Sequence, residues 1–289
     1  KYESLFLHAS GFIPQKEEAP VGVVYNMKIC IWITKIFDLG GTKRVVSLLA
    51  NELVKEHEVT IMTYEDRFRE DRTMYHLSED INVDFIDNSQ FVNKHHTPAF
   101  CARYLVKKLN DRSGMFNKKS LNPILAEAIF PQKTREKWVE YFNSQDYDVI
   151  LTTASLSLRL AMIAPRLKAA TIGWQHNCYD GYLHVKPVVF WQQENLLQQY
   201  LPNLDRYIVL SDYDKRDYME KLGIDCEVKI NPRSFVSEKK CDVKSKRFLM
   251  ATRFVYAKGL DLMMESFEEF CKEDSEWELD IIGDGDLFD

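Results

Sequence analysis

The stretch KICIWIT (28–34), followed closely by FDLGGTKRVV (37–46), indicates the fold class of this chain. The first segment is a nearly continuous apolar run, which is typical of a parallel strand covered on both faces. After the glycine pair, apolar residues recur at helical spacing, which predicts a helix over 41–55. A buried strand that passes through a glycine turn into a helix is the first half of a βαβ unit.

The same alternation continues along the chain. Further apolar, strand-like runs lie at 58–63, 82–86, 148–153, 170–175, 206–211 and 227–230. Helical patterns lie between them, most clearly near 155–167, 187–201 and 212–222. Alternating strands and helices predict an α/β fold with a doubly wound parallel sheet. A second βαβ unit is expected from a strand at 246–252, a helix at 260–273 and a strand at 276–283.

These patterns divide the chain into parts. Residues 1–26 lack the basic-then-apolar order of a signal peptide, so we expect a leader or tag of unclear origin there. Residues 27–232 are predicted to form an N-terminal Rossmann-like domain, and the polar segment 233–245 a linker. Residues 246–289 would begin a second domain. Because two strands and one helix cannot bury a domain core, we expect this second domain to be truncated.

The overall composition excludes several classes of function. Hydrophobic residues make up 45% of the chain, which is ordinary for a globular protein, and no apolar run approaches the ~18 residues that span a bilayer. A net charge of −6 argues against bulk nucleic-acid binding, which usually requires a basic domain. None of the six cysteines belongs to a C-x-x-C pair, so we expect no zinc site and a reducing, cytoplasmic location.

One segment, 103–137, is strongly basic although the whole chain is acidic. Its basic residues are Arg103, Lys107, Lys108, Arg112, Lys118, Lys119, Lys133, Arg135 and Lys137. It holds only three acids, and aromatic residues are interleaved with the cations. One interpretation is a solvated insertion. The other is a surface for anionic lipid, centred on Lys107, Lys108, Lys118 and Lys119, where each basic residue contributes ~1 kcal/mol near the membrane.

Two motifs follow predicted strands in the first domain. Gly40 and Gly41 join the first strand to the first helix, and paired glycines allow a ligand to approach the backbone closely. The alternative is a simple tight turn, because the dinucleotide fingerprint G-x-G-x-x-G is absent. His176, in WQHNCYDGY (174–182), lies just past the fifth strand, at the edge of the sheet where ligands bind in open α/β folds. A lone histidine can equally be structural.

Two further motifs lie in the second βαβ unit. Arg253 and Lys258 flank the turn before a predicted helix, where cations oppose the helix macrodipole unless an anion is bound. An arginine fork and a mobile lysine would together clamp a diphosphate; the alternative is two solvated surface cations. The turn IIGDGD (281–286) contains a D-x-D pattern that could hold Mn²⁺, but its glycines explain the turn without a metal, so no metal is predicted.

In combination, these stretches resemble the retaining, GT-B-fold glycosyltransferases of the GT4 group over residues 27–289. The resemblance rests on GGTKRVVSLLANEL (40–53), DRYIVLSDYDKRDY (205–218), KINPRSF (229–235), ATRFVYAKGLDLMMESF (251–267) and LDIIGDGD (279–286). It implies a GT-B-like fold, with an N-terminal Rossmann-like domain and the first βαβ portion of a second one. The Pro-Arg pair after Asn231 is similar to the subset that assembles bacterial surface polysaccharides.

The resemblance also implies roles for particular residues. The donor would be a nucleotide-diphosphate sugar, with a UDP-sugar expected, and no cofactor would be needed. Donor-binding residues would be Gly40, Gly41, Arg253, Lys258, Gly283 and Gly285. Catalytic residues would be His176, Arg253 and Lys258, with the two cations stabilising the departing diphosphate and His176 beside the sugar.

The implied reaction is sugar transfer, with retention, to a glycan or lipid-linked acceptor in cell-surface polysaccharide or glycolipid synthesis. The enzyme would be cytoplasmic and would lie at the inner face of the membrane. The acidic E-x7-E element of the family follows the G-D-G turn and would lie beyond Asp289, so impaired activity is expected. Two alternatives remain: a non-catalytic, Rossmann-like remnant that binds a partner or membrane, and a nucleotide-sugar epimerase or dehydrogenase, which the missing G-x-G-x-x-G disfavours.

Overall fold

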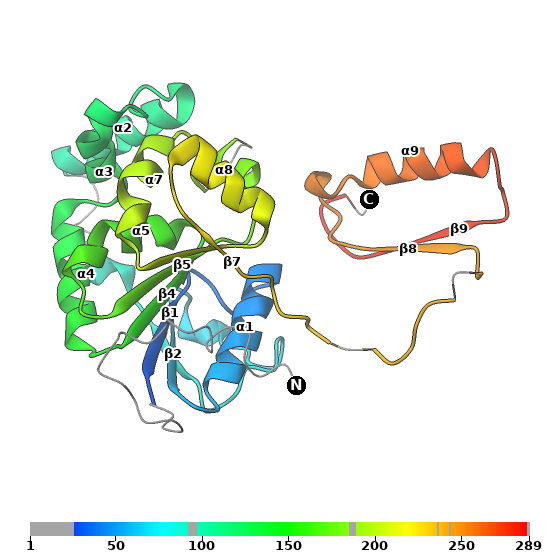
Figure 1. Cartoon of the computed structure of the whole chain (residues 1–289), viewed down its shortest axis with the longest axis horizontal. Helices are drawn as coiled ribbons and strands as arrows, with labels where there is room; N and C mark the ends of the chain where they lie inside the picture. Colours follow the sequence, from blue (N-terminus) through cyan, green and yellow to red (C-terminus); the bar gives the residue numbers. More distant parts are fainter. Residues whose placement is uncertain (1–25, 92–96, 185–188, 236, 243, 288–289) are drawn as a thin grey trace. The chain divides into compact units, whose positions relative to one another are not determined.

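The computed structural model describes residues 26–91, 97–184, 189–235, 237–242 and 244–287 (Figure 1). Apart from Asn26, the leader predicted at 1–26 lies outside this part of the chain. The structure forms two compact units, one ending at Ser234 and the other beginning at Phe235, and each unit has its own sheet. No helix within the described ranges is both long enough and apolar enough to cross a bilayer.

The first unit is built on a seven-stranded sheet in the order β3-β2-β1-β4-β5-β6-β7. Its strands are β1 (Lys28–Trp32), β2 (Glu58–Thr63), β3 (Asn82–Phe85), β4 (Val149–Thr153), β5 (Ala170–Trp174), β6 (Arg206–Val209) and β7 (Glu227–Val228). Every neighbouring pair is parallel. The chain builds outward from β1 to β3 and then returns to pair β4 with β1. The predicted doubly wound sheet is therefore confirmed.

Helices cover both faces of this sheet (Figure 1). They are α1 (Gly41–Leu53), α2 (Pro98–Ser113), α3 (Asn122–Ile129), α4 (Gln132–Ser144), α5 (Ser155–Ile163), α6 (Tyr179–Leu183), α7 (Glu194–Tyr200) and α8 (Asp212–Leu222). Alternate residues of each strand face opposite sides. Along β1, Ile29 and Ile31 pack into the core beneath α1, whereas Cys30 and Trp32 pack into the larger core beneath α4, α5 and α7. This two-sided burial explains the continuous apolar run of β1.

The basic segment 103–137 is an integral layer of the first unit. In α4, Trp138 stacks on Phe91 at a centroid distance of 3.9 Å and meets Trp32 at 4.6 Å. Within the segment itself, Leu125, Ala126 and Phe130 are each at most 2% exposed. The interpretation of the whole segment as a solvated insertion is therefore wrong, because the side chains of α3 and α4 help to form the larger core. Seven of the nine cations are exposed, whereas Arg103 and Arg135 are partly buried, and the outer side of α2 stays exposed.

The second unit is a compact βαβ unit formed by β8 (Arg247–Ala251), the 3₁₀ helix η6 (Tyr256–Lys258), α9 (Leu260–Cys271) and β9 (Glu278–Ile282). The two strands are parallel, with Arg247 opposite Glu278. One face of this small sheet carries an aromatic cluster in which Phe248 of β8 contacts Phe267 and Phe270 of α9. The predicted order of strand, helix and strand is confirmed.

Candidate functional site

The loops that carry the candidate residues of the first unit leave one edge of its sheet. Gly40 and Gly41 follow β1, and His176 follows β5. The strand order places β4 between these two strands, so the turn from β4 into α5 separates the two loops. This edge is the carboxyl end of the strands and includes the point where the direction of strand addition reverses. Open α/β sheets bind ligands at such a point.

The loop between β1 and α1 is held by a buried acid. The Oε2 atom of Glu65, just past β2, accepts hydrogen bonds from the backbone N–H groups of Ile36 (2.5 Å) and Phe37 (2.9 Å). Tyr75 accepts another from the Gly40 N–H at 2.8 Å. Sequence reasoning missed Glu65; the available signal was an acid directly after an apolar strand.

The two glycines of this loop are not equivalent. A Cβ atom on Gly40 would lie 3.0 Å from Cδ and 3.1 Å from Nζ of Lys43, whereas a Cβ on Gly41 would meet nothing within 4 Å. The Lys43 side chain folds back over the loop, with Nζ 3.7 Å from Oδ2 of Asp38. This cation lowers the pKa of the Asp38 carboxyl below its usual range. Gly40 therefore makes room for Lys43, and Gly41 leaves the start of α1 open.

His176 is neutral at pH 7. Its ring packs against Trp174 in a tilted arrangement, with a centroid distance of 4.2 Å and an interplanar angle of 49°, and burial lowers its pKa from 6.5 to about 4. Asn231 approaches the ring and partly opposes this lowering. Within the described part of the chain, neither ring nitrogen has a partner in hydrogen-bond geometry. A neutral imidazole has one donor and one acceptor nitrogen, and the Asn231 side chain is close enough to compete with a ligand for one of them.

The loop that carries His176 rests on a buried hydrogen-bond network. Oε1 of Gln175 accepts from the hydroxyls of Tyr207 (2.7 Å) and Tyr218 (2.5 Å), and its Nε2 donates to the Asn177 carbonyl at 2.9 Å. Gln175 is 1% exposed. Sequence reasoning missed this residue, although a glutamine that ends the apolar run ATIGWQ was a signal. The network fixes the backbone on both sides of His176.

We expect the pKa of His176 to make the first unit less stable in mild acid. Between pH 6.5 and about 4, the unfolded chain binds this proton and the folded chain does not, so stability falls as pH falls through that window. The shift corresponds to at most about 3 kcal/mol. Denaturant unfolding at pH 7 and pH 4.5 measures it. The His176→Phe variant should not show this part of the stability loss between pH 7 and pH 4.5. An NMR titration midpoint of His176 near 6.5 would contradict the burial argument.

In the second unit, Arg253 and Lys258 lie on the loop between β8 and α9, and both are exposed. Among the described residues, no carboxylate lies within 4.0 Å of either cation. Gly259, with φ 63°, precedes α9 and supplies no side-chain cap to the helix. The first-turn N–H groups of α9 and both cations therefore remain available in this unit. The diphosphate clamp itself stays a prediction.

Gly283 and Gly285 pack directly against the loop that carries Arg253. A Cβ atom on Gly283 would fall 1.7 Å from the Thr252 carbonyl oxygen, and Gly285 has φ 151°. The Phe254 N–H donates to the Asp284 carbonyl at 2.8 Å. Both glycines are thus required for this contact, and their proposed place in a nucleotide pocket is a separate prediction. Within the described ranges, no cluster of three metal-ligating side chains occurs.

The four lysines predicted to meet a membrane differ in their surroundings. Lys107 and Lys108 belong to α2, whereas Lys118 and Lys119 lie between α2 and α3. All four are exposed. Nζ of Lys107 is 2.5 Å from Oδ2 of Asp111, so its charge is already paired.

Comparisons with known proteins agree with this architecture. No curated protein matches the sequence. Among solved structures, TarM is similar with a TM-score of 0.59 at 12% identity, over 91% of this chain and 73% of TarM. The lipopolysaccharide outer core galactosyltransferase WaaB, in its apo form, is similar with a TM-score of 0.54 at 18% identity, over 91% of this chain and 62% of WaaB.

These similarities establish the fold alone, and they confirm the predicted GT-B-like architecture. A variant of S. aureus TarM, solved with fondaparinux, α-GlcNAc-glycerol and UDP, matches equally well, with a TM-score of 0.58 at 12% identity over 91% of this chain and 73% of that one. The model of glycosyltransferase family 4 matches residues 39–234, more than half of the chain. That range includes Gly40, Gly41 and His176. The chain therefore belongs to glycosyltransferase family 4.

Proposed function

We propose that this protein transfers a sugar, with retention, from a UDP-sugar to a glycan or lipid-linked acceptor in cell-surface polysaccharide or glycolipid synthesis. Membership of glycosyltransferase family 4 supports sugar transfer. The solved structure of the S. aureus TarM variant contains UDP and a GlcNAc-glycerol, and WaaB is a lipopolysaccharide galactosyltransferase, which favours this donor and this acceptor class.

The proposed chemistry relies on charge stabilisation. As the glycosidic bond breaks, negative charge accumulates on the diphosphate, and fixed donors aimed at that charge lower the barrier. Arg253 offers a two-pronged contact and Lys258 a mobile point charge. The neutral imidazole of His176 would hydrogen-bond hydroxyl groups of the transferred sugar. Retention without a carboxylate nucleophile implies attack by the acceptor hydroxyl on the same face that the diphosphate leaves.

The observation that carries this proposal is the pair of exposed cations, Arg253 and Lys258, with no carboxylate partner in the described chain. Calorimetric titration with UDP, UDP-glucose, UDP-galactose and UDP-N-acetylglucosamine tests it. We expect saturable binding of UDP and of one UDP-sugar, together with slow release of UDP from that sugar. A chain that binds none of these nucleotides would instead support the non-catalytic alternative.

We also propose that the protein works at the cytoplasmic face of an anionic membrane through the outer side of α2. This side, called the α2 face below, carries exposed apolar residues beside basic ones: Tyr104, Leu105, Lys108, Leu109 and Arg112. Tyr104 is 59% exposed and Leu105 55%. The five residues of the α2 face recur at helical spacing, so they form one stripe along the helix. Exposed apolar side chains next to cations are typical of interfacial helices.

Reversing charge on the α2 face should release the protein from vesicles. Each basic residue near an anionic surface contributes ~1 kcal/mol, so Lys108→Glu with Arg112→Glu should weaken binding about 10- to 100-fold. Co-sedimentation with phosphatidylserine-containing vesicles at low and high salt measures this. Lys133→Glu, which reverses an exposed cation on α4, is the control and should bind normally. Binding that is absent, or that does not respond to salt, would contradict the membrane proposal.

A further inference from the structure

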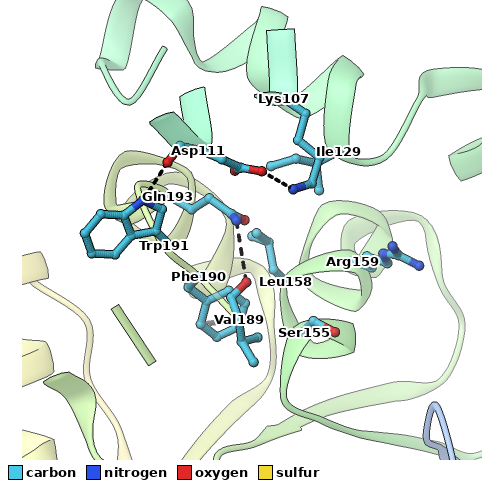
Figure 2. A pocket seen from close by; sticks show the side chains of 10 residues that line it. All are labelled: Lys107, Asp111, Ile129, Ser155, Leu158, Arg159, Val189, Phe190, Trp191 and Gln193. Atoms are coloured by element: carbon cyan, nitrogen blue, oxygen red, sulfur yellow. Dashed lines mark hydrogen bonds and ion pairs between the residues drawn. The ribbon is translucent and has the colours of Figure 1, made fainter. Parts of the chain in front are cut away.

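A cavity of about 430 Å³ lies within the first unit, between α2, α5 and the segment 189–193 (Figure 2). Its volume is within the range of about 300–1,000 Å³ that small-molecule sites occupy. Lys107 and Asp111 enter it from α2, and Ser155 enters from the first residue of α5 (Figure 2). The partly exposed Ile129, Val189 and Trp191 supply apolar wall, over a floor that includes the buried Leu158 and Phe190. None of these residues was singled out for donor binding or catalysis.

The wall of this cavity is held in place by a fully buried side chain. Asn110, which is 0% exposed, donates from Nδ2 to the Gln192 carbonyl at 2.8 Å and accepts from the Phe116 N–H at 3.1 Å. The Trp191 indole donates to the Asp111 carbonyl at 2.9 Å. These bonds tie the segment 189–193 to the end of α2. The cavity is therefore preformed.

The cavity lies at the same edge of the sheet as the loop that carries His176. Thr153 of β4 pairs with Trp174 of β5, and Ser155 and His176 each lie two residues beyond that pair. A second connection passes through Tyr182, whose hydroxyl accepts from the His176 N–H at 3.4 Å and whose carbonyl accepts from the Phe190 N–H at 3.0 Å. One ligand could thus fill the cavity and extend to the edge of the sheet where the proposed transfer takes place.

The polar groups in the cavity suit an uncharged ligand with several hydroxyls. Nζ of Lys107 and Oδ2 of Asp111 are 2.5 Å apart, so their charges offset each other while both still offer hydrogen bonds. The other cation that lines the cavity is Arg159, whose Cζ lies 5.8 Å from the Phe130 ring centroid and whose guanidinium interacts with the Tyr64 hydroxyl. An ammonium donor and a carboxylate acceptor match hydroxyl groups, which both donate and accept.

We propose that this cavity binds a saccharide unit of the acceptor, with Lys107 and Asp111 bonding its hydroxyls and the partly exposed Val189 and Trp191 contacting its C–H faces. This inference rests on the proposed function and names the acceptor class. A phosphate headgroup fits less well, because the lysine beside it is already neutralised by Asp111. The ion pair is partly exposed, so its removal should change stability little.

Saturation-transfer NMR on the full chain tests the cavity, with methyl glycosides of glucose, galactose and N-acetylglucosamine as probes and octyl phosphate as the competing chemistry. We expect at least one glycoside to bind, and Asp111→Asn and Lys107→Met each to weaken it about 10-fold or more. The matched control Lys133→Met, which removes a cation of α4, should bind like the wild type.

Three results would overturn the proposal: no glycoside binds, octyl phosphate alone binds, or a glycoside binds the cavity variants unchanged. Calorimetry with UDP on the same samples tests the transferase proposal separately from the saccharide cavity. UDP binding without glycoside binding would reject the saccharide cavity and keep the transferase proposal. Glycoside binding that the two cavity variants weaken, without any UDP or UDP-sugar binding, would reject the transferase and keep the cavity as a saccharide site.

Discussion

Arg253→Ala and Lys258→Ala should each weaken UDP binding about 10- to 100-fold, because a hydrogen bond to a charged group contributes about 1.5–3 kcal/mol. Both cations are exposed and lie before α9, whose first-turn N–H groups also favour an anion. No carboxylate in the described chain competes for either cation. Calorimetric titration at fixed ionic strength measures the loss, and the double variant should bind more weakly than either single one.

Arg247→Ala is the matched control for this prediction. Arg247 is an exposed arginine of β8 in the same unit, but Glu278 and Asp280 already pair with it, at 2.5 Å and 3.4 Å respectively. Its removal should leave UDP binding unchanged. Arg253→Lys is informative as well, because lysine keeps the charge and loses the planar fork. If both alanine variants bind UDP as tightly as the wild type does, the clamp is wrong and the two residues are solvated surface cations.

The parts of the fold that the sequence predicted are those with local signals. KICIWIT is apolar from Ile29 to Ile33 because β1 is covered on both faces, so its strand and the helix after it were evident from spacing alone. The positions of Gly40 and His176 followed from the same logic. Each comes shortly after a buried strand, and all the strands of a parallel sheet end at the same edge.

The supports beneath these loops were not predictable, because their partners are distant in sequence. Glu65 bonds backbone groups 28 and 29 residues away, and Gln175 bonds hydroxyls 32 and 43 residues away. Composition also could not predict which way each side chain of α2 faces. Lys107 and Lys108 are adjacent and identical, yet Lys107 lines the cavity and pairs with Asp111, whereas Lys108 lies on the α2 face. Only the helical rotation between neighbouring residues separates their surroundings.

The same reasoning predicts that Gln175→Leu will be among the most destabilising single changes in the first unit. Leucine removes the acceptor of two buried hydroxyls, those of Tyr207 and Tyr218, and burial raises the pKa of both, so they remain protonated donors. The two hydroxyls lie 3.5 Å apart, so one can still bond the other and one donor is left unpaired. An unpaired buried donor costs about 1–3 kcal/mol, so the free energy of unfolding should fall by about that amount. Guanidinium unfolding followed by circular dichroism measures it.

A mutant cycle shows whether the hydroxyls cause this loss. When both partners of a buried hydrogen bond become apolar, the net cost is small, because no polar group is left unsatisfied. Gln175→Leu should therefore cost much less in a background that carries Tyr207→Phe and Tyr218→Phe. An equal cost in both backgrounds would show that the network does not stabilise the fold in this way. Gln175 also donates a hydrogen bond to the Asn177 carbonyl, which leucine cannot replace. The triple variant should therefore recover stability while the NMR signals of His176 remain shifted. That separation would show that Gln175 both stabilises the unit and positions the histidine.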